Sequence, residues 1–209
     1  MITKVSVAIE RELRHCDAFY ISVAFITEGG LAPLKQVLAE LRDKGILGKI
    51  LTTSYLTFTE PKALKTLADL SNVEVRVYDS TDEGASGFHT KGYIFKEEEI
   101  YRFIVGSSNM TASAFSVNKE WNTKLVSTSD GELLKQMMTE FNALWNSKHT
   151  LAVKDFIEDY EVRYRLIKEQ KKNAAKEQMV DLQAYKLQPN KMQARFVSNF
   201  RKLLESNEH

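Results

Sequence analysis

The feature that most constrains the fold is the alternation of strand-like and helix-like segments over roughly the first 80 residues. Runs rich in β-branched and aromatic residues predict buried strands, and segments whose leucines lie three or four residues apart predict amphipathic helices. We expect strands at 18–26, 49–56 and 73–78, with one helix at 31–43 and another that begins near Pro61. This order predicts a parallel sheet with right-handed crossover connections.

The regular alternation ends after the third predicted strand. Two strand-like runs, 88–95 and 100–105, are separated by Lys96–Glu99, which is short enough for a hairpin. A further run at 121–127 precedes an amphipathic helix at 131–145. We therefore expect an α/β fold, in which a mixed, largely parallel sheet is sandwiched by helices.

The rest of the chain predicts a helical extension. Apolar residues recur at helical spacing from Phe156 to Ile167, and the following stretch KEQKKNAAKEQ is polar on all sides, which is typical of a helix that projects or bridges. Leu187–Asn190 interrupts this helix before a last amphipathic helix at 192–204. The predicted parts are a main domain at 1–150, a helical linker at 151–186 and a terminal segment at 187–209.

Composition narrows the class of protein. The chain has 209 residues, of which 43% are hydrophobic and 27% charged, and these values exclude collagen-like and wholly disordered proteins. No apolar run approaches the roughly 20 residues that span a bilayer, and the N-terminus shows no secretory signal. The single cysteine, Cys16, excludes an intrachain disulfide. We expect a cytoplasmic protein with no membrane partner.

The distribution of charge leaves the partner open. The net charge is +1; residues 1–150 hold 17 basic and 19 acidic side chains, and residues 151–209 hold 12 and 9. Neither part is a polybasic arm. Charge alone therefore does not predict a nucleic acid partner, and it does not forbid a local phosphate site.

The stretch richest in candidate functional groups is FHTKGYIF, at residues 88–95. On a strand, His89 and Lys91 point to the same face, so an imidazole is predicted beside an ammonium. Two polar groups on one inward face are costly unless a partner satisfies them. A phosphate would do so, because Lys91 supplies a positive charge and His89 a nucleophilic or proton-donating nitrogen.

A second polar group follows the next predicted strand. Gly106 and the small residues Ser107 and Ser108 suit a turn and permit close approach of the backbone, and the Asn109 amide can donate two hydrogens to an anionic oxygen. Glu120 starts a further strand-like run, where its carboxylate could accept the second imidazole proton and orient the ring. The predicted phosphate-binding residues are Lys91, Ser107, Ser108 and Asn109.

Together these residues resemble the phospholipase D (PLD) superfamily. The pattern is His89-x-Lys91, then Gly106-Ser107-Ser108-Asn109, then Glu120, and its last part is similar to the nuclease branch. That branch includes metal-independent restriction endonucleases and PLD-like domains fused to helicases. The phrases SSNMTASAFSVNKEWN and ISVAFITEGGL resemble the helicase-associated members. The likeness covers most of residues 1–150.

One position departs from the superfamily motif. The full motif has an aspartate five residues after the lysine, and here that position holds Lys96. The resemblance suggests that Glu120 takes over the role of this aspartate.

The resemblance implies a double displacement at phosphorus, with His89, Lys91, Asn109 and Glu120 as the catalytic residues. His89 attacks the phosphodiester to form a covalent phosphohistidine, a second histidine protonates the leaving oxygen, and water releases the phosphate. Lys91, Asn109 and a serine stabilise the charge that develops at phosphorus. This chemistry needs no metal and no other cofactor. The implied activity is metal-independent cleavage of DNA, bound through its phosphate backbone.

The resemblance also implies a homodimer and a longer protein. The family chemistry uses two H-x-K patterns and this chain has one, so we expect the active site at a dimer interface, with His89 of both chains facing one phosphate. The terminal stretch Leu187–Gln193 resembles the entry to the motor of superfamily 2 helicases, in which a glutamine at the place of Gln193 contacts adenine. No phosphate-binding loop follows it, so the motor itself is absent from this chain.

Two other functions remain open. In the first, a catalytically inactive module binds a backbone phosphate and dimerises to position a helicase on nucleic acid, and Lys96 in place of the aspartate slightly favours it. In the second, the chain is a lipid phosphodiesterase, which we rank low because the sequence shows neither a basic amphipathic helix nor an exposed apolar lid.

Overall fold

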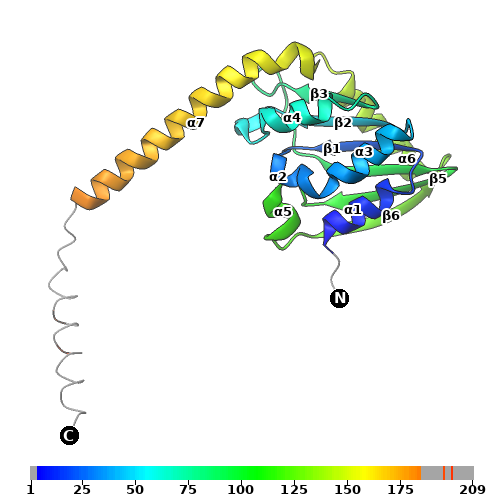
Figure 1. Ribbon diagram of the computed structural model, residues 1–209, viewed down its shortest axis with the longest axis horizontal. Coiled ribbons are helices and arrows are strands. Elements are labelled where there is room, and N and C mark those ends of the chain that lie inside the picture. Colours follow the sequence, from blue (N-terminus) through cyan, green and yellow to red (C-terminus); the bar gives the residue numbers. More distant parts are fainter. Residues whose placement is uncertain (1–3, 185–194, 196–198, 200–209) are drawn as a thin grey trace, which may run out of the picture. The chain divides into compact units, whose positions relative to one another are not determined.

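The computed structural model describes residues 4–184 together with Arg195 and Asn199 (Figure 1). The chain forms two compact units, Met1–Arg165 and Leu166–His209. The first unit runs past residue 150, where the main domain was expected to end. The predicted terminal segment, 187–209, lies outside the described residues except for Arg195 and Asn199.

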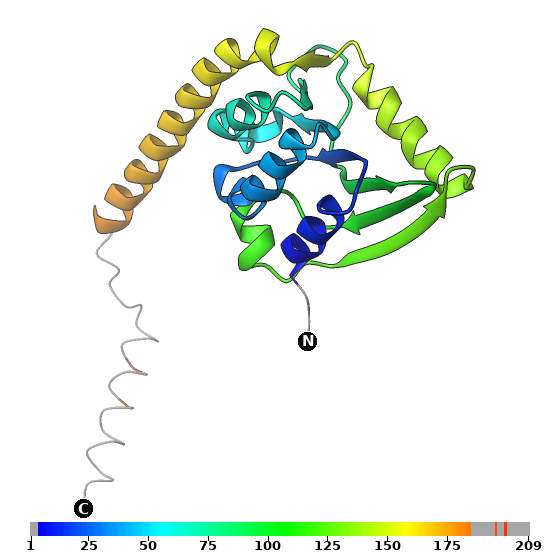
Figure 2. The same ribbon diagram turned by 45° about the vertical axis from the view of Figure 1, so that its right-hand side comes forward.

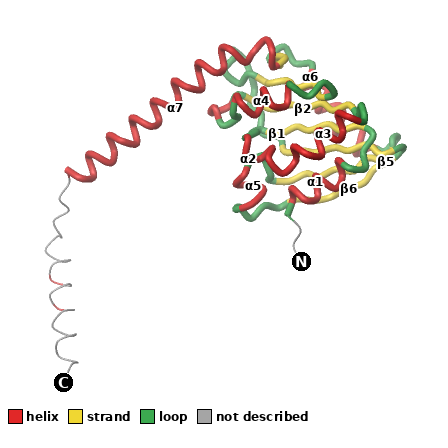
Figure 3. The backbone as a smooth tube through the Cα atoms, viewed as in Figure 1, coloured by secondary structure: helices red, strands yellow, loops and turns green. Residues whose placement is uncertain are grey.

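A seven-stranded mixed sheet runs through the first unit, in the order β6-β5-β4-β1-β2-β3-β7 (Figure 3). Its strands are β1 (Ala18–Val23), β2 (Leu47–Thr53), β3 (Val73–Tyr78), β4 (Lys91–Glu97), β5 (Ile100–Gly106), β6 (Asn122–Thr128) and β7 (Thr150–Ala152). The pairs β1–β2 and β2–β3 are parallel, and all the others are antiparallel. The predicted α/β fold with a mixed sheet is confirmed, but less of the sheet is parallel than predicted, because β4, β5 and β6 form an antiparallel meander.

Helices cover both faces of the sheet, unequally (Figure 2). They are α1 (Val5–Leu13), α2 (Glu28–Leu31), α3 (Lys35–Asp43), α4 (Pro61–Ala68), α5 (Ala112–Ser116), α6 (Glu132–Trp145) and α7 (Val153–Ala184), with 3₁₀ turns η1 (Ala32–Leu34) and η2 (Tyr55–Thr57). Helices α1, α3 and α4 bury their apolar residues in one core, and α6 packs on the opposite face. No helix in the described part of the chain is long and apolar enough to cross a bilayer.

The start of α7 belongs to the core of the first unit. Phe156, Ile157 and Tyr160 are buried in the same cluster as α1, α3 and α4, and the Tyr160 hydroxyl donates to the Thr59 carbonyl oxygen at 2.7 Å. Burial of side chains of this size contributes several kcal/mol to the stability of the fold. The extension is therefore anchored by its first turns, which explains why the compact unit runs to Arg165.

Several elements differ from the predicted ones. The strand expected at 49–56 ends at Thr53, and η2 follows, in which Leu56 and Thr57 have φ of 52° and 56°. The helix expected at 31–43 is divided into α2, η1 and α3, with Pro33 inside the 3₁₀ turn. The short elements α1, α5 and β7 were not predicted, and α1 carries Glu10, Arg11 and Glu12 among its apolar residues, which obscures its pattern.

Gly48, near the start of β2, makes room for the ring of Phe19, its cross-strand neighbour in β1. A Cβ atom at this position would lie 2.0 Å from the ring of Phe19, which is fully buried in β1. Only glycine leaves space for that ring. Where β1 and β2 begin, the Phe19 ring therefore packs directly against the backbone of Gly48.

Candidate active site

The ends of several strands bring the predicted site residues to one edge of the sheet. Strands β1, β2, β3 and β5 end at the edge where β4, β6 and β7 begin, because the latter run antiparallel to their neighbours. We call this end of the strands the site edge and their opposite end the far edge; neither term refers to the outermost strands, β6 and β7. His89 precedes β4, Ser107–Asn109 follow β5, and Glu120 precedes β6. Every residue that the sequence predicts for the site thus lies at the site edge.

The imidazole and the ammonium are in contact. β4 begins at Lys91, so His89 lies just before the strand rather than within it. Lys91 Nζ lies 2.9 Å from His89 Nδ1 and 3.4 Å from Nε2, and it also donates to the His89 carbonyl oxygen at 3.1 Å. Because an ammonium can only donate, the ring nitrogen that faces it accepts. His89 is exposed, so a phosphate in solution can reach both groups.

Thr90 ties this segment to β1. Its carbonyl oxygen accepts from the Ala24 backbone N–H at 3.0 Å, and its hydroxyl lies 2.6 Å from the Ser22 hydroxyl. The residue between His89 and Lys91 is therefore held by both backbone and side chain. This attachment positions the two flanking side chains on a fixed backbone.

The surroundings of Lys91 suit an anion. Partial burial lowers the pKa of its ammonium below the ordinary value, and the negative charge of Glu120 opposes that shift. An ammonium that burial destabilises gains more from a nearby anion than one in bulk water does, because the local dielectric constant is lower. This is the electrostatic behaviour expected of a phosphate ligand.

Asn109 joins the loop after β1 to the loop after β5. Its Oδ1 accepts from the Phe25 backbone N–H at 3.1 Å, which directs the two amide hydrogens to the opposite side. Met110 N–H donates to the Phe25 carbonyl oxygen at 3.1 Å, and Thr27 N–H donates to the Met110 carbonyl oxygen at 3.0 Å. Ile26 and Met110 form an isolated parallel bridge. The backbone thus holds the Asn109 amide in one orientation.

Glu120 and Ser107 form a hydrogen-bonded pair. Ser107 Oγ donates to the Glu120 carboxylate and accepts from the Trp121 backbone N–H at 3.0 Å. Asn118 Nδ2 donates to the other carboxylate oxygen at 3.2 Å. The hydrogen bonds that the structure gives Glu120 thus come from Ser107 and Asn118, whereas the sequence predicts one from His89. Its charge nevertheless acts on Lys91.

Ser108 lies in the core rather than at the surface. It is fully buried, its hydroxyl accepts from Asn122 Nδ2 at 2.9 Å, and its carbonyl oxygen accepts from the Tyr93 hydroxyl at 3.1 Å. Burial, together with the nearby charge of Glu120, raises the pKa of Tyr93, so that its hydroxyl remains a donor. Of the two predicted serine ligands, the structure therefore brings only Ser107 to the surface of the site.

Lys96, the departure from the superfamily motif, lies at the other end of β4. It pairs with Ala18, where β1 begins, and its carbonyl oxygen accepts from Asp17 N–H at 2.7 Å. Five residues of strand separate it from Lys91 by about 16 Å. An aspartate at this position would not reach His89. Glu120 does not lie at that position but at the site edge, and its role there stays a prediction.

A hollow of about 670 Å³ opens beside these residues at the site edge. Asn109 and Glu120 line one part of it, and the aromatic rings of Phe25 and Phe58 line another. The Phe25 ring also lies 6.0 Å from the His89 ring, between centroids. Sequence reasoning missed both phenylalanines, because an aromatic residue after an apolar strand is indistinguishable from core by pattern alone.

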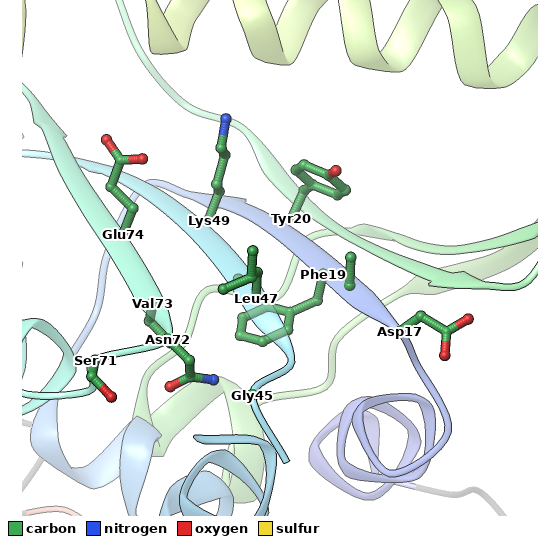
Figure 4. A pocket seen from close by; sticks show the side chains of 12 residues that line it. Asp17, Phe19, Tyr20, Gly45, Leu47, Lys49, Ser71, Asn72, Val73 and Glu74 are labelled. Carbon is green, nitrogen blue, oxygen red and sulfur yellow. The ribbon is translucent and has the colours of Figure 1, made fainter. Parts of the chain in front are cut away.

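A second hollow, of about 620 Å³, lies at the far edge (Figure 4). Tyr20, Lys49 and Glu74 stand on one side of the strands there, and Phe19 and Asn72 lie on the other. It contains none of the residues that the sequence predicts for the site. Among the residues that the structure describes, no group of three or more His, Cys, Asp or Glu side chains is arranged to hold a metal ion.

Comparisons with known proteins identify the family of this chain. A family model described as "Cardiolipin synthase, PLD-like domain" matches residues 16–145, a range that contains every predicted site residue. The chain therefore belongs to the PLD-like domain family. A search of the curated proteins found no match.

Solved structures share the fold at low sequence identity. Nuc from Salmonella typhimurium, a phospholipase D family member, has a TM-score of 0.51 and 17% identity over 70% of this chain and 88% of its own. NucT from Helicobacter pylori has a TM-score of 0.53 and 14% identity over 71% of this chain and 91% of its own. Phosphatidylserine synthase from Haemophilus influenzae Rd KW20 has a TM-score of 0.54 and 15% identity over 84% of this chain, which spans 44% of that protein.

Proposed function

We propose that this chain is a metal-independent phosphodiesterase that cleaves DNA through a covalent phosphohistidine at His89. The observation that carries the proposal is the 2.9 Å contact between Lys91 Nζ and His89 Nδ1 at an exposed edge of the sheet. Asn109 and the Ser107–Glu120 pair belong to the same edge. A nucleophile, a cation and an oriented amide donor are the groups that displacement at an anionic phosphorus requires.

The reaction proceeds in two displacements. A His89 ring nitrogen attacks phosphorus, and the bond to the leaving oxygen breaks as that oxygen takes a proton from a second histidine. Water then loses a proton to the same second histidine and attacks phosphorus, which breaks the P–N bond and restores His89. Lys91 and Asn109 balance the charge on the phosphoryl oxygens in both steps.

The second histidine comes, in this proposal, from another copy of the chain. Apolar side chains at the β6 side of the sheet support self-association: Trp121, next to Glu120, is 88% exposed, and Val126 is 60% exposed. A homodimer that packs the site edges of two chains against each other near Trp121 would bring two His89 rings toward one phosphate.

Two measurements test the proposal. Plasmid DNA is incubated with protein in excess EDTA, and the protein is quenched in alkali to detect an acid-labile phosphohistidine. We expect the DNA to be cleaved and the phosphohistidine to be detected. Both results are expected to be lost in His89→Ala but not in His15→Ala, which removes another exposed histidine. DNA left intact by the wild type, or labelling that persists in His89→Ala, contradicts the proposal.

The shared site is tested by mixing subunits. Wild type and His89→Ala are unfolded together, refolded in equal amounts and assayed. If each phosphate needs both His89 rings, only dimers of two wild-type chains are active, so activity falls to about a quarter of the all-wild-type value. A value of about one half indicates independent sites and contradicts the shared one.

A lipid substrate is the second candidate. The loop of Tyr55, Leu56 and Phe58 is 44–52% exposed, so the chain does present an exposed apolar segment, contrary to the expectation from sequence. The family model carries the name of cardiolipin synthase. Hydrolysis of phosphatidylcholine or phosphatidylglycerol vesicles in place of DNA would favour this candidate.

The inactive phosphate-binding module stays the alternative; Lys96, which slightly favours it, lies at the far edge, away from His89. The association with a helicase rests on the resemblance of SSNMTASAFSVNKEWN, ISVAFITEGGL and the terminal stretch Leu187–Gln193, and it stays a prediction from the sequence.

A further inference from the structure

An aromatic wall, formed by Phe25 and Phe58, stands beside the candidate catalytic pair. Phe25 follows β1 and Phe58 follows η2, and their rings meet edge to face, with centroids 4.9 Å apart. Phe25 in turn meets the His89 ring at 6.0 Å. Phe58 is 48% exposed. The aromatic surface therefore lies next to the candidate nucleophile, within reach of a group esterified to a phosphate bound there.

The loop that carries Phe58 is held in an unusual conformation. Leu56 and Thr57 both have positive φ, which is costly for a branched side chain and rare for a β-branched one. Thr57 N–H donates to the Ser54 carbonyl oxygen at 3.0 Å, and Tyr55 N–H donates to Thr53 Oγ1 at 3.2 Å. These bonds keep the loop turned so that Phe58 lies against Phe25. Strain of this kind is retained where the surrounding structure enforces it, and it concentrates at ligand sites.

The wall shares its hollow with polar groups. Thr27, Thr111, Ser113 and Asn118 line the same space as Phe25 and Phe58. Two carboxylates, those of Glu60 and Glu120, line it as well. An acyl chain in this hollow would take these carboxylates away from water, which is costly. A nucleobase has a flat π-face for the aromatic rings and N–H groups at its edge that can donate to the carboxylates. The mixed lining therefore favours a base over a lipid chain.

We propose that Phe25 and Phe58 stack on an unpaired nucleobase next to the scissile phosphate, so that the site takes single-stranded nucleic acid. This inference rests on the proposed function, because it needs a phosphodiester at His89. In a duplex the bases are stacked on each other and paired, and Phe58 could reach one only after unpairing. Stacking on aromatic rings is tolerant of sequence, so little base preference is expected.

Binding to fluorescent oligodeoxynucleotides tests this inference. The protein carries His89→Ala so that no strand is cut, and the probes are a single strand, its duplex and the same strand with abasic sites. The single strand is expected to bind at least about fivefold more tightly than the abasic strand, which keeps the phosphates but lacks bases. Phe58→Ala is expected to remove this difference.

Three further variants separate stacking from apolar contact. Phe58→Trp keeps a π-face and is expected to retain the preference for bases, whereas Phe58→Leu keeps apolar volume alone and is expected to lose it. Tyr55→Ala removes an exposed aromatic residue of the same loop that does not line the hollow, and it is expected to bind like its parent. Circular dichroism verifies that each variant is folded.

The outcomes distinguish the two proposals. Equal binding of the normal, abasic and duplex probes overturns the inference, even if the wild type cleaves DNA. Sedimentation with phosphatidylglycerol vesicles that decreases in Phe58→Ala, without any preference for bases, overturns it in favour of a lipid. The wild-type protein could also prefer probes with bases through Phe58 and yet form no phosphohistidine. That result would support the inference and contradict only the proposed chemistry.

Discussion

Each edge of the sheet carries a hollow, and the charged side chains at the two edges differ in their partners. At the far edge, Lys49 Nζ lies 5.2 Å from the centroid of the Trp145 ring, and Glu74 pairs with Arg76 at 2.8 Å. At the site edge, Lys91 Nζ lies within hydrogen-bond distance of the His89 imidazole rather than of an aromatic ring face. The volumes, about 620 and 670 Å³, are nearly equal. The partners of the charges therefore distinguish a candidate site, and the size of the hollow does not.

The most direct test of this comparison removes one side chain at each edge. His89→Ala is expected to lower kcat for DNA cleavage by at least about 10³-fold, since it removes the proposed nucleophile. Lys49→Ala at the far edge is expected to leave kcat within about twofold. The melting temperature of His89→Ala should stay near that of the wild type, because the side chain is exposed. Similar losses of activity in both variants would contradict the assignment of the site edge.

The next effect concerns the charge of Lys91. Lys91→Ala is expected to lower kcat by about 10²- to 10³-fold, because the phosphoryl charge loses its cation. In the wild type, burial lowers the pKa of Lys91, so activity is expected to fall with rising pH, beginning below the pH at which a solvated lysine titrates. A pH–rate profile of Lys91→Arg tests the cause: the arginine stays charged, so this alkaline loss is expected to disappear. Its persistence would assign the loss to another group.

A change at the far edge is expected to alter stability without altering chemistry. Gly48→Ala places a Cβ where the Phe19 ring lies, at 2.0 Å, and is expected to lower the free energy of unfolding by about 1–3 kcal/mol. Urea denaturation measures this loss. The kcat of the protein that remains folded is expected to match the wild type. A selective loss of kcat, at unchanged stability, would show that the two edges are coupled.

The smallest expected effect is a gain. Glu98, in the far-edge turn between β4 and β5, has φ of 52° and is exposed. Glu98→Gly removes the steric cost of the positive φ, but it also raises the conformational entropy of the unfolded chain. The net gain in the free energy of unfolding is therefore expected to be at most about 1 kcal/mol. Thermal melting checks it, and Glu99→Gly, beside it in the same turn, serves as the control. Destabilisation of Glu98→Gly relative to that control would refute the argument.

The sequence predicts the site edge well because its signals are local. The two-residue spacing of His89 and Lys91 places an imidazole beside an ammonium even though the strand begins only at Lys91. The order of the predicted strands brings Asn109 and Glu120 to the same edge. By contrast, the burial of Ser108 depends on where β5 ends, and strand ends are uncertain by a residue or more from sequence alone. A shift of one residue exchanges an outward for an inward side chain.

Other features depend on contacts that no local pattern encodes. The positive φ of Leu56 and Thr57 occurs without a glycine, so nothing in the residues 54–58 indicates the turn that exposes Phe58. β7 has three residues and exists through its pairing with β3. The hydrogen bond between Ser107 and Glu120 likewise joins two loops that are distant along the chain. These are tertiary effects, and only the assembled sheet reveals them.

The parallel bridge between Ile26 and Met110 has a mechanical consequence. Gly30 packs so closely on this segment that a Cβ would lie 2.0 Å from the Met110 carbonyl oxygen. Two segments that are more than 80 positions apart in the chain are thereby joined as one stiff unit. Asn109 cannot shift toward an arriving substrate unless Phe25 travels with it. A substitution that loosens either segment is therefore expected to displace the other as well.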